Sequence, residues 1–282
     1  MRRLAAVVSL AFLCASAACG ADLAAAAARM DADFAAGKPL VAHVVVALVD
    51  NAHQGIVPVP ASLGDGTDPR SNLYWGARYG VRTFFRKQPG WQMLAIAPSG
   101  HARVLDRVLF HRTVERGGRS GDAYVVAEAW QGEHIADAIR HFLEMNRGEH
   151  AESIRLDERA FEAGGAAHVI AFIGHNGLMD FAAPVLEASR APLLAHASIV
   201  LACYSDRYFG ALLDAQSAPL ITTTGLMAPE AYTLEAVLER WFSGARSDQV
   251  RGAAAAAYAH HQKISGSAAL RLFRTGSRNL GP

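Results

Sequence analysis

The chain alternates between short apolar runs and stretches rich in polar and flexible residues. Several runs contain many β-branched residues and have the length of a buried strand: 41–49 (VAHVVVALV), 167–174 (AHVIAFIG), 198–205 (SIVLACYS) and 218–224 (APLITTT). Helical spacing follows two of these runs, in DRYFGALLDAQ and APEAYTLEAVLERWFSGA. Continuously apolar strands that alternate with helices are typical of a mainly parallel sheet with helices on both faces. The pattern therefore predicts an α/β fold.

Further elements are expected between and after these strands. A Gly- and Pro-rich loop over 50–70 precedes apolar positions at helical spacing, which predict a helix over 72–87 with Ser71 as its N-cap. Before the second apolar run, the pattern predicts a strand over 91–97, a small β-hairpin insertion over 102–130 and an amphipathic helix over 132–146. The alanine-rich C-terminus, 248–276, predicts one or two helices.

The first 21 residues have the composition of a secretory signal peptide. They combine Arg2 and Arg3 with an apolar run too short to span a bilayer and with small residues at its end. Acylation of Cys19 is the alternative, which would anchor the protein through a lipid. We therefore expect export to the periplasm or the exterior. The expected organisation is a signal peptide, a leader segment, an α/β domain and a helical segment packed on that domain: 1–21, 22–38, 39–245 and 246–282.

Charge and cysteine content bear on whether the protein binds nucleic acid or a membrane and on whether it forms a disulfide. The chain has 27 Lys+Arg and 26 Asp+Glu, so it is nearly neutral with or without the predicted signal peptide. Nucleic-acid binding is not expected, because no basic patch with stacking aromatics stands out. Membrane binding is expected only through a lipid on Cys19. Cys14 and Cys19 lie in the predicted signal peptide, which leaves Cys203 as a single thiol without a disulfide partner.

Two strand ends carry residues with catalytic chemistry. His175 follows a strand that ends in FIG, and Cys203 ends the strand IVLA. Neighbouring parallel strands would bring both side chains to one sheet edge, where an imidazole can hold the cysteine as a reactive thiolate. Gly177 adds a flexible backbone whose amide can stabilise an oxyanion. The alternatives are a small buried cysteine and a hydrogen-bonded histidine at the edge of the core.

A hydrophobic strand ending in His and Gly, followed by a hydrophobic strand ending in Ala202-Cys203, resembles the caspase-like cysteine peptidases. The resemblance covers about 40–224, since VAHVVVALVDN is similar to that fold's first strand. It implies a caspase-hemoglobinase α/β fold with His175 and Cys203 as the catalytic dyad. Family members usually have His and Gly adjacent, whereas Asn176 separates them here. The stretches NLYWGARYG, IGHNGLMDF and TTGLMAPEAYTLE are also similar to a family of exported bacterial proteins.

Three charged residues are candidates for substrate binding. The resemblance places Arg70 where the fold often supplies a pocket residue, which would bind an acidic side chain through its planar fork. Asp180 and Glu230 have the opposite preference, for a basic substrate residue. The alternatives are a surface arginine and a first-turn acid that stabilises its own helix. The substrate's charge stays open at this point.

No metal or other cofactor is expected. His134, Asp137 and His141 share one face of the predicted helix over 132–146, but histidines two turns apart are poorly spaced for chelation. His260 and His261 are adjacent and point in different directions on a helix.

We therefore predict an exported cysteine hydrolase, most simply a peptidase acting on a peptide or protein substrate. A catalytically silent envelope protein with the same fold, using the loop over 50–76 to hold a partner, is one alternative. A small-molecule amidase with the same dyad is the other. The sequence leaves the oligomeric state open.

Overall fold

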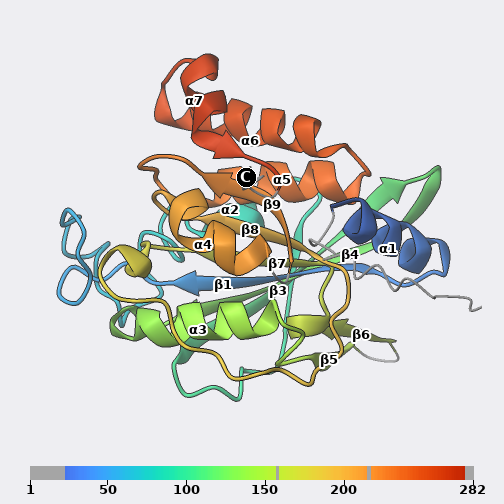
Figure 1. Cartoon of the computed structure of the whole chain (residues 1–282), viewed down its shortest axis with the longest axis horizontal. Coiled ribbons are helices and arrows are strands. Elements are labelled where there is room, and N and C mark those ends of the chain that lie inside the picture. The colour runs from blue at the N-terminus through green and yellow to red at the C-terminus, as the bar shows by residue number, and fades with distance from the viewer. Residues whose placement is uncertain (1–22, 157–158, 215–216, 277–282) are drawn as a thin grey trace, which may run out of the picture.

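The computed structural model describes residues 23–156, 159–214 and 217–276. Its centre is an eight-stranded sheet with the order β10-β9-β8-β7-β1-β4-β3-β2 (Figure 1). The strands β4, β1, β7, β8 and β9 pair in parallel, and antiparallel pairing adds β3, β2 and β10. The bounds of these strands are β1 Leu40–Ala47, β2 Gln92–Leu94, β3 Val104–Arg116, β4 Arg119–Trp130, β7 Val169–Ile173, β8 Ala197–Leu201, β9 Ala218–Thr223 and β10 Phe273–Arg274. The predicted α/β fold with a mainly parallel sheet is confirmed.

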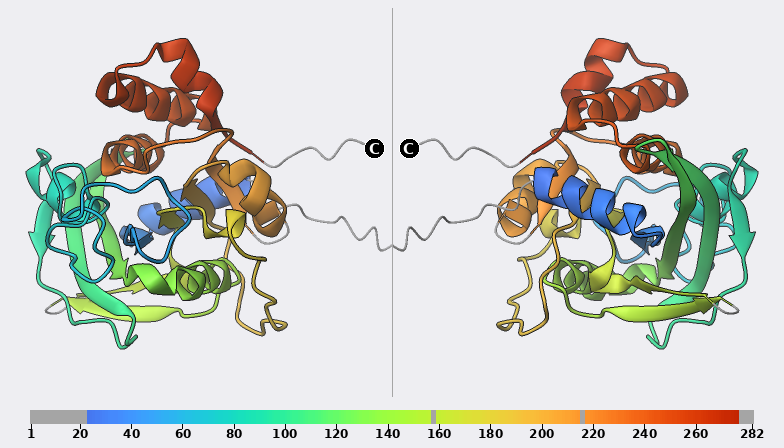
Figure 2. Two further views of the ribbon diagram at one scale, coloured as in Figure 1. Left: turned by 90° about the vertical axis from the view of Figure 1, so that its left-hand side faces the viewer. Right: turned by 90° about the vertical axis from the view of Figure 1, so that its right-hand side faces the viewer.

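Helices cover both faces of the sheet, which explains why the parallel strands are continuously apolar. Every residue of β1 is buried, because Val44 and Val46 belong to one core cluster while Val45 belongs to the other. One face packs against helices α1 Leu23–Ala35, α2 Val81–Lys87 and α5 Ala231–Phe242, and the other against α3 Ile135–Met145 and α4 Ser205–Asp214. Figure 2 shows these layers from two sides.

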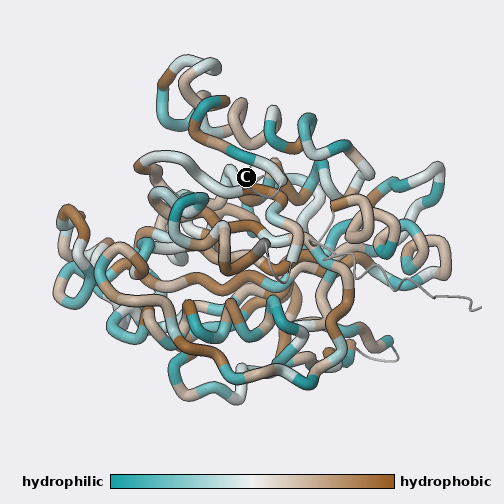
Figure 3. The backbone as a smooth tube through the Cα atoms, viewed as in Figure 1, coloured by the Kyte–Doolittle hydropathy of each residue, from teal (hydrophilic) through white to brown (hydrophobic). Residues whose placement is uncertain are grey.

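The C-terminal region is helical, as predicted. The helix α6 Ser247–Gln262 packs on α5, and α7 Gly266–Leu272 packs on α6 before the chain returns to the sheet as β10. Figures 1 and 2 show α6 and α7 outside α5. Figure 3 shows the strands as the hydrophobic centre and these outer helices as a mixture of apolar and polar positions.

The helix expected over 72–87 is shorter than predicted. It begins at Val81, and the residues before it form turns. The buried Asn72 explains the difference, because its side chain bonds the backbone of two other segments. Its Nδ2 donates to the carbonyl oxygens of Val49 and Asp65, at 2.8 and 3.0 Å, and its Oδ1 accepts from the Val49 amide. These bonds order the loop after β1 in a conformation that a helix starting at Ser71 would not allow.

The hairpin over 102–130 is part of the main sheet. Its strands β3 and β4 pair as predicted, but β4 also pairs in parallel with β1 and so joins the core. The expected strand over 91–97 is limited to the short β2. A separate hairpin of β5 Glu152–Leu156 and β6 Arg159–Ala163 was not predicted, since its alternating pattern is short.

The helix α1 occupies most of the expected leader segment and packs on the domain. Its buried residues Ala26, Met30 and Phe34 recur at helical spacing and join the core cluster beneath α5. We expect Met30→Ala to lower the free energy of unfolding by about 2–3 kcal/mol, because a fully buried thioether is removed and a cavity remains. Denaturant unfolding measures the change. The exposed Ala25→Ser should change it by less than about 0.5 kcal/mol, and equal effects would contradict this packing.

The predicted signal peptide, with Arg2, Arg3, Cys14 and Cys19, lies outside the described residues. In the part of the chain that the structure describes, none of the helices is both long and apolar enough to cross a membrane.

Candidate active site

His175 and Cys203 lie at equivalent positions beyond two neighbouring strands. The strands β7 and β8 pair in parallel with Ile173 opposite Leu201, and each candidate residue follows its strand by two positions. Ile173 and Leu201 both belong to the core cluster on the α5 side of the sheet. This register places His175 and Cys203 at the same edge of the sheet, just beyond the carboxyl ends of the two strands.

Hydrogen bonds tie the two strand ends together. The Gly174 amide donates to the Leu201 carbonyl oxygen at 3.3 Å, and Asn176 Nδ2 donates to the Cys203 carbonyl oxygen at 2.6 Å. Tyr204 then takes a left-handed conformation with φ of +50°, which is uncommon for a bulky residue and occurs mostly where the surrounding structure imposes it. The thiol therefore sits on a tightly turned connection between β8 and α4.

Asp180 contacts the imidazole. Its Oδ2 lies 2.6 Å from His175 Nε2, and the same oxygen accepts from the Gly55 amide at 3.2 Å. His175 is only 8% exposed, so the carboxylate fixes a ring that is already held by packing. This contact occupies Nε2, and Nδ1 makes no hydrogen bond with the described residues. In the structure Asp180 is a partner of the imidazole, and the substrate-binding role suggested by the sequence stays a prediction.

The sulfur of Cys203 is held by the backbone of Met227. The Met227 amide donates to Sγ at 3.4 Å, and the thiol donates to the Met227 carbonyl oxygen at 3.6 Å. Among the described residues, these are the hydrogen bonds of this sulfur, and it makes none with the His175 imidazole. Cys203 is partly exposed. The residue is therefore not sealed within the core.

The Gly177 amide is already bonded. It donates to the His175 carbonyl oxygen at 3.1 Å, within the turn that starts a short 3₁₀ helix, Gly177–Met179. A Cβ at this position would lie 2.5 Å from the ring of Phe181. The glycine is therefore required for close packing under the histidine loop. Its role as an oxyanion donor stays a prediction.

Glu230 is held by Gln262 from α6 and by Tyr232 from the helix that Glu230 precedes. It lies at the N-cap of α5, where its side chain makes no capping bond with the described backbone. Gln262 Nε2 donates to its Oε2 at 3.1 Å and also to the Tyr232 hydroxyl at 2.7 Å. Burial raises the pKa of Glu230, and the hydrogen bonds from Tyr232 and Gln262 oppose that shift. The structure thus presents a half-buried carboxylate with two fixed neighbours.

Two tyrosines experience the charges of both this carboxylate and the Cys203 thiol. Burial raises the pKa of Tyr74 and of Tyr258, and the nearby Cys203 and Glu230 raise both further. The Tyr258 hydroxyl also accepts a hydrogen bond from the Ala228 amide at 3.0 Å. Both phenol groups are therefore within electrostatic range of Cys203 and of Glu230.

Arg70 lies on the surface of the loop over 50–76. Its side chain is 90% exposed and forms an ion pair with Asp68, whose Oδ1 is 3.0 Å from Nε. The position is also distant in sequence from the start of α2 at Val81. These observations match the alternative reading of a surface arginine, and its role in a pocket stays a prediction.

The histidines considered as metal ligands are dispersed. His134 Nδ1 lies 3.5 Å from Asp137 Oδ2 on the surface, whereas the ring of His141 faces Trp130, with ring centroids 4.8 Å apart. His261 stacks on Tyr232, with ring centroids 4.2 Å apart, and the ring of His260 is nearly perpendicular to that of His261.

Sequence reasoning missed several residues that shape the site. Asn176 follows a strand and precedes a helical turn, which is a recognisable capping position, but its bond to the Cys203 carbonyl depends on strand register. Met227 acts through its backbone, and Gln262 comes from α6. No local pattern identifies such contacts.

The site combines a partly exposed thiol, an imidazole–carboxylate pair and a half-buried glutamate. These groups gather where ligand sites are usual in open α/β folds, beyond the carboxyl ends of parallel strands. Comparison of the chain with known protein families, curated proteins and solved structures finds no match.

Proposed function

We propose that the protein is an exported cysteine hydrolase, a peptidase with a caspase-hemoglobinase-like arrangement of its sheet and catalytic residues. The observation that carries this proposal is the placement of His175 and Cys203 at matched ends of β7 and β8. The partly exposed thiol supports a nucleophile, and the 2.6 Å contact between Asp180 and His175 supports an oriented base.

The proposed reaction uses each of these groups once in acylation and once in deacylation. The Cys203 thiol transfers its proton to His175 Nδ1, and the thiolate attacks the substrate carbonyl carbon to form a tetrahedral intermediate. The imidazolium then protonates the leaving amine, and the acyl group stays on sulfur. Water, deprotonated by the same imidazole, releases the acid and restores the thiol. Asp180 holds the ring and stabilises its charged form.

This mechanism requires a small movement in the substrate complex. The sulfur must leave the Met227 carbonyl and approach the imidazole, while the Met227 amide remains a donor to the thiolate. Catalytic hydrogen bonds are often long in the absence of substrate and shorten when it binds. A substrate backbone that replaces Met227 as a hydrogen-bond partner would drive the change.

A peptide-library cleavage assay with active-site titration tests the proposal. A peptidase cleaves library members in proportion to titrated Cys203. A silent binding protein titrates with iodoacetamide but cleaves nothing, and a small-molecule amidase turns over small amides without cleaving peptides. Either of the last two results would contradict the peptidase assignment.

We propose further that the peptidase prefers a basic residue beside the scissile bond. Glu230 shares its surroundings with Cys203 through Tyr74 and Tyr258, and a half-buried carboxylate favours a cationic partner. We expect Glu230→Gln to reduce kcat/KM for a lysine or arginine substrate by about tenfold or more, the value of one charge-assisted hydrogen bond. Neutral substrates should be almost unaffected, as measured with matched fluorogenic peptides.

The pH dependence of substrate selectivity gives a second test of the proposed preference for a basic residue. Since burial raises the pKa of Glu230 above 4.5, the carboxylate loses its charge on acidification earlier than an exposed glutamate would. The ratio of basic to neutral substrate turnover should therefore fall as the pH drops toward that raised pKa. In Glu230→Gln the ratio should stay flat. A wild-type ratio that is also flat, or a loss that is equal for both substrates, would contradict the assignment.

A further inference from the structure

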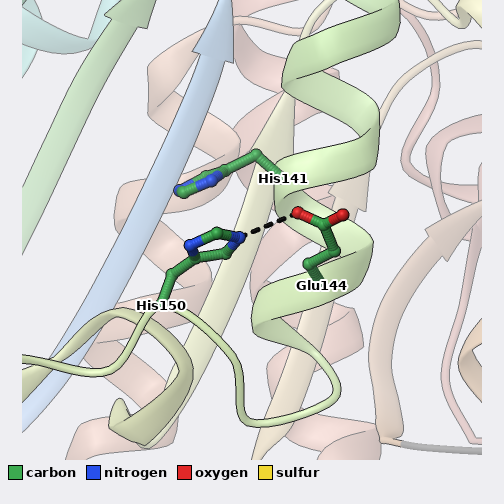
Figure 4. A group of neighbouring side chains, drawn as sticks. All are labelled: His141, Glu144 and His150. Carbon is green, nitrogen blue, oxygen red and sulfur yellow. Dashed lines mark hydrogen bonds and ion pairs between the residues drawn. The ribbon is translucent and has the colours of Figure 1, made fainter. Parts of the chain in front are cut away.

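A second cluster of ligating side chains lies on the opposite face of the sheet. His141 and Glu144 are three residues apart on α3 and share one face of the helix, and His150 reaches back from the connection that follows it (Figure 4). His150 Nε2 lies 2.8 Å from Glu144 Oε2, and the two imidazole centroids are 4.3 Å apart. One ligand atom from each of the three residues lies within 4.8 Å of the others.

We propose that His141, Glu144 and His150 bind a divalent first-row metal ion, Zn²⁺ foremost. Two imidazoles and one carboxylate form a donor set that zinc accepts, and the fourth position of a tetrahedral ion would be taken by water. The ion would replace the hydrogen bond between His150 and Glu144 by two bonds to one centre. It would thereby fix the connection after α3 to the helix itself.

His141 is suited to this role because its ring nitrogens form no hydrogen bond or ion pair with the part of the chain that the structure describes. Among the described residues, its contacts are ring contacts with Trp130, His101 and His150. An imidazole without a hydrogen bond can offer a nitrogen lone pair to a metal ion.

The cluster is open to an ion and held in place. The side chain of His150 is 42% exposed and that of Glu144 is 23% exposed, so solvent reaches the ligand atoms. His150 has a left-handed backbone with φ of +54°. A Cβ at Gly164 would overlap the His150 carbonyl oxygen, so the glycine allows the two segments to approach closely. This packing fixes the direction in which the imidazole leaves the loop.

A neighbouring cluster of His43, Glu128 and Glu152 has a different character. Arg107 already pairs with both of its carboxylates, with Nε 3.1 Å from Glu128 and Nη2 paired with Glu152. The Gly164 amide donates to His43 Nδ1 at 3.1 Å, which uses one of the two ring nitrogens. A cation would have to displace the guanidinium from a buried site, so the charges there favour an internal ion network over a metal.

Titration calorimetry with Zn²⁺ tests the site, using the full protein with Cys203→Ser to remove thiol binding. We expect one ion per chain, and an affinity at least about tenfold lower in His141→Ala, His150→Ala and Glu144→Gln. His111→Ala is the matched control, because His111 also pairs with a carboxylate, Asp122, at 2.8 Å. Its affinity should equal that of the parent.

Cobalt provides a second readout on the near-isosteric variant. Co²⁺ bound with four ligands absorbs in the visible range, and Glu144→Gln should weaken those bands while its circular dichroism stays that of the parent. The proposal is overturned if the parent binds no Zn²⁺, or if the three variants bind as tightly as His111→Ala. It is also overturned if Glu152→Gln, and not Glu144→Gln, abolishes binding, since the ion would then lie in the buried network.

Discussion

Replacing Cys203 with alanine should reduce kcat/KM for peptide cleavage by at least about a thousandfold, because the covalent route disappears with its nucleophile. The residual rate would come from binding and orientation alone. Cys203 is partly exposed, and among the described residues its sulfur is bonded only to the Met227 backbone, so the loss of the thiol should leave the fold intact. Steady-state kinetics with a fluorogenic peptide measures the change.

Two controls accompany this variant. Met93→Ala removes an exposed side chain on β2, at the other edge of the sheet, and should keep wild-type kinetics. Circular dichroism and the melting temperature of Cys203→Ala should match those of the parent. A folded Cys203→Ala protein that retains more than about a tenth of the activity would show that the thiol is not the nucleophile.

Replacing Asp180 with asparagine should lower kcat by about 10²–10⁴-fold and leave KM nearly unchanged. The amide keeps the size of the side chain and still offers an oxygen to the Gly55 amide, but it no longer stabilises an imidazolium at His175. As a positioning residue, Asp180 should also alter the pH profile of kcat, because the charged imidazole loses its partner. A structural role alone would not move that profile.

Asp68→Asn is the matched control for Asp180→Asn. Asp68 is also a loop carboxylate with a single cationic partner, Arg70, but that pair lies on the surface, and its loss should change kcat less than twofold or so. If Asp180→Asn instead raises KM for basic substrates and leaves kcat and its pH profile unchanged, Asp180 binds substrate and does not orient the base.

The apolar pattern was sufficient to predict the core strands and the side of the sheet where the site lies. β-branched runs identify β1, β7, β8 and β9, and their parallel pairing follows from the helices between them. The positions of His175 and Cys203 relative to the strand ends were therefore readable from the sequence. Their matched register was a consequence of the fold and required the structure.

Contacts between distant segments could not be predicted in the same way. Asn72 ends the expected helix early through bonds to Val49 and Asp65, which compete with helical bonds. Glu230 resembles a helix-capping acid in sequence, yet its side chain makes no capping bond with the described backbone and accepts from Gln262, which lies in another helix. His141 and His150 are nine positions apart, and only the turn after α3 brings their rings together. In each case the decisive interaction is non-local.

The central claim is that His175 activates Cys203, and covalent labelling tests it most directly. A peptidyl acyloxymethyl ketone ending in lysine should give one adduct by intact-protein mass spectrometry, mapped to Cys203. Labelling should be absent in Cys203→Ala and about a hundredfold slower in His175→Ala, the scale of general acid–base assistance. Equally fast labelling without the imidazole, or no adduct on a thiol that iodoacetamide still reaches, would contradict the account.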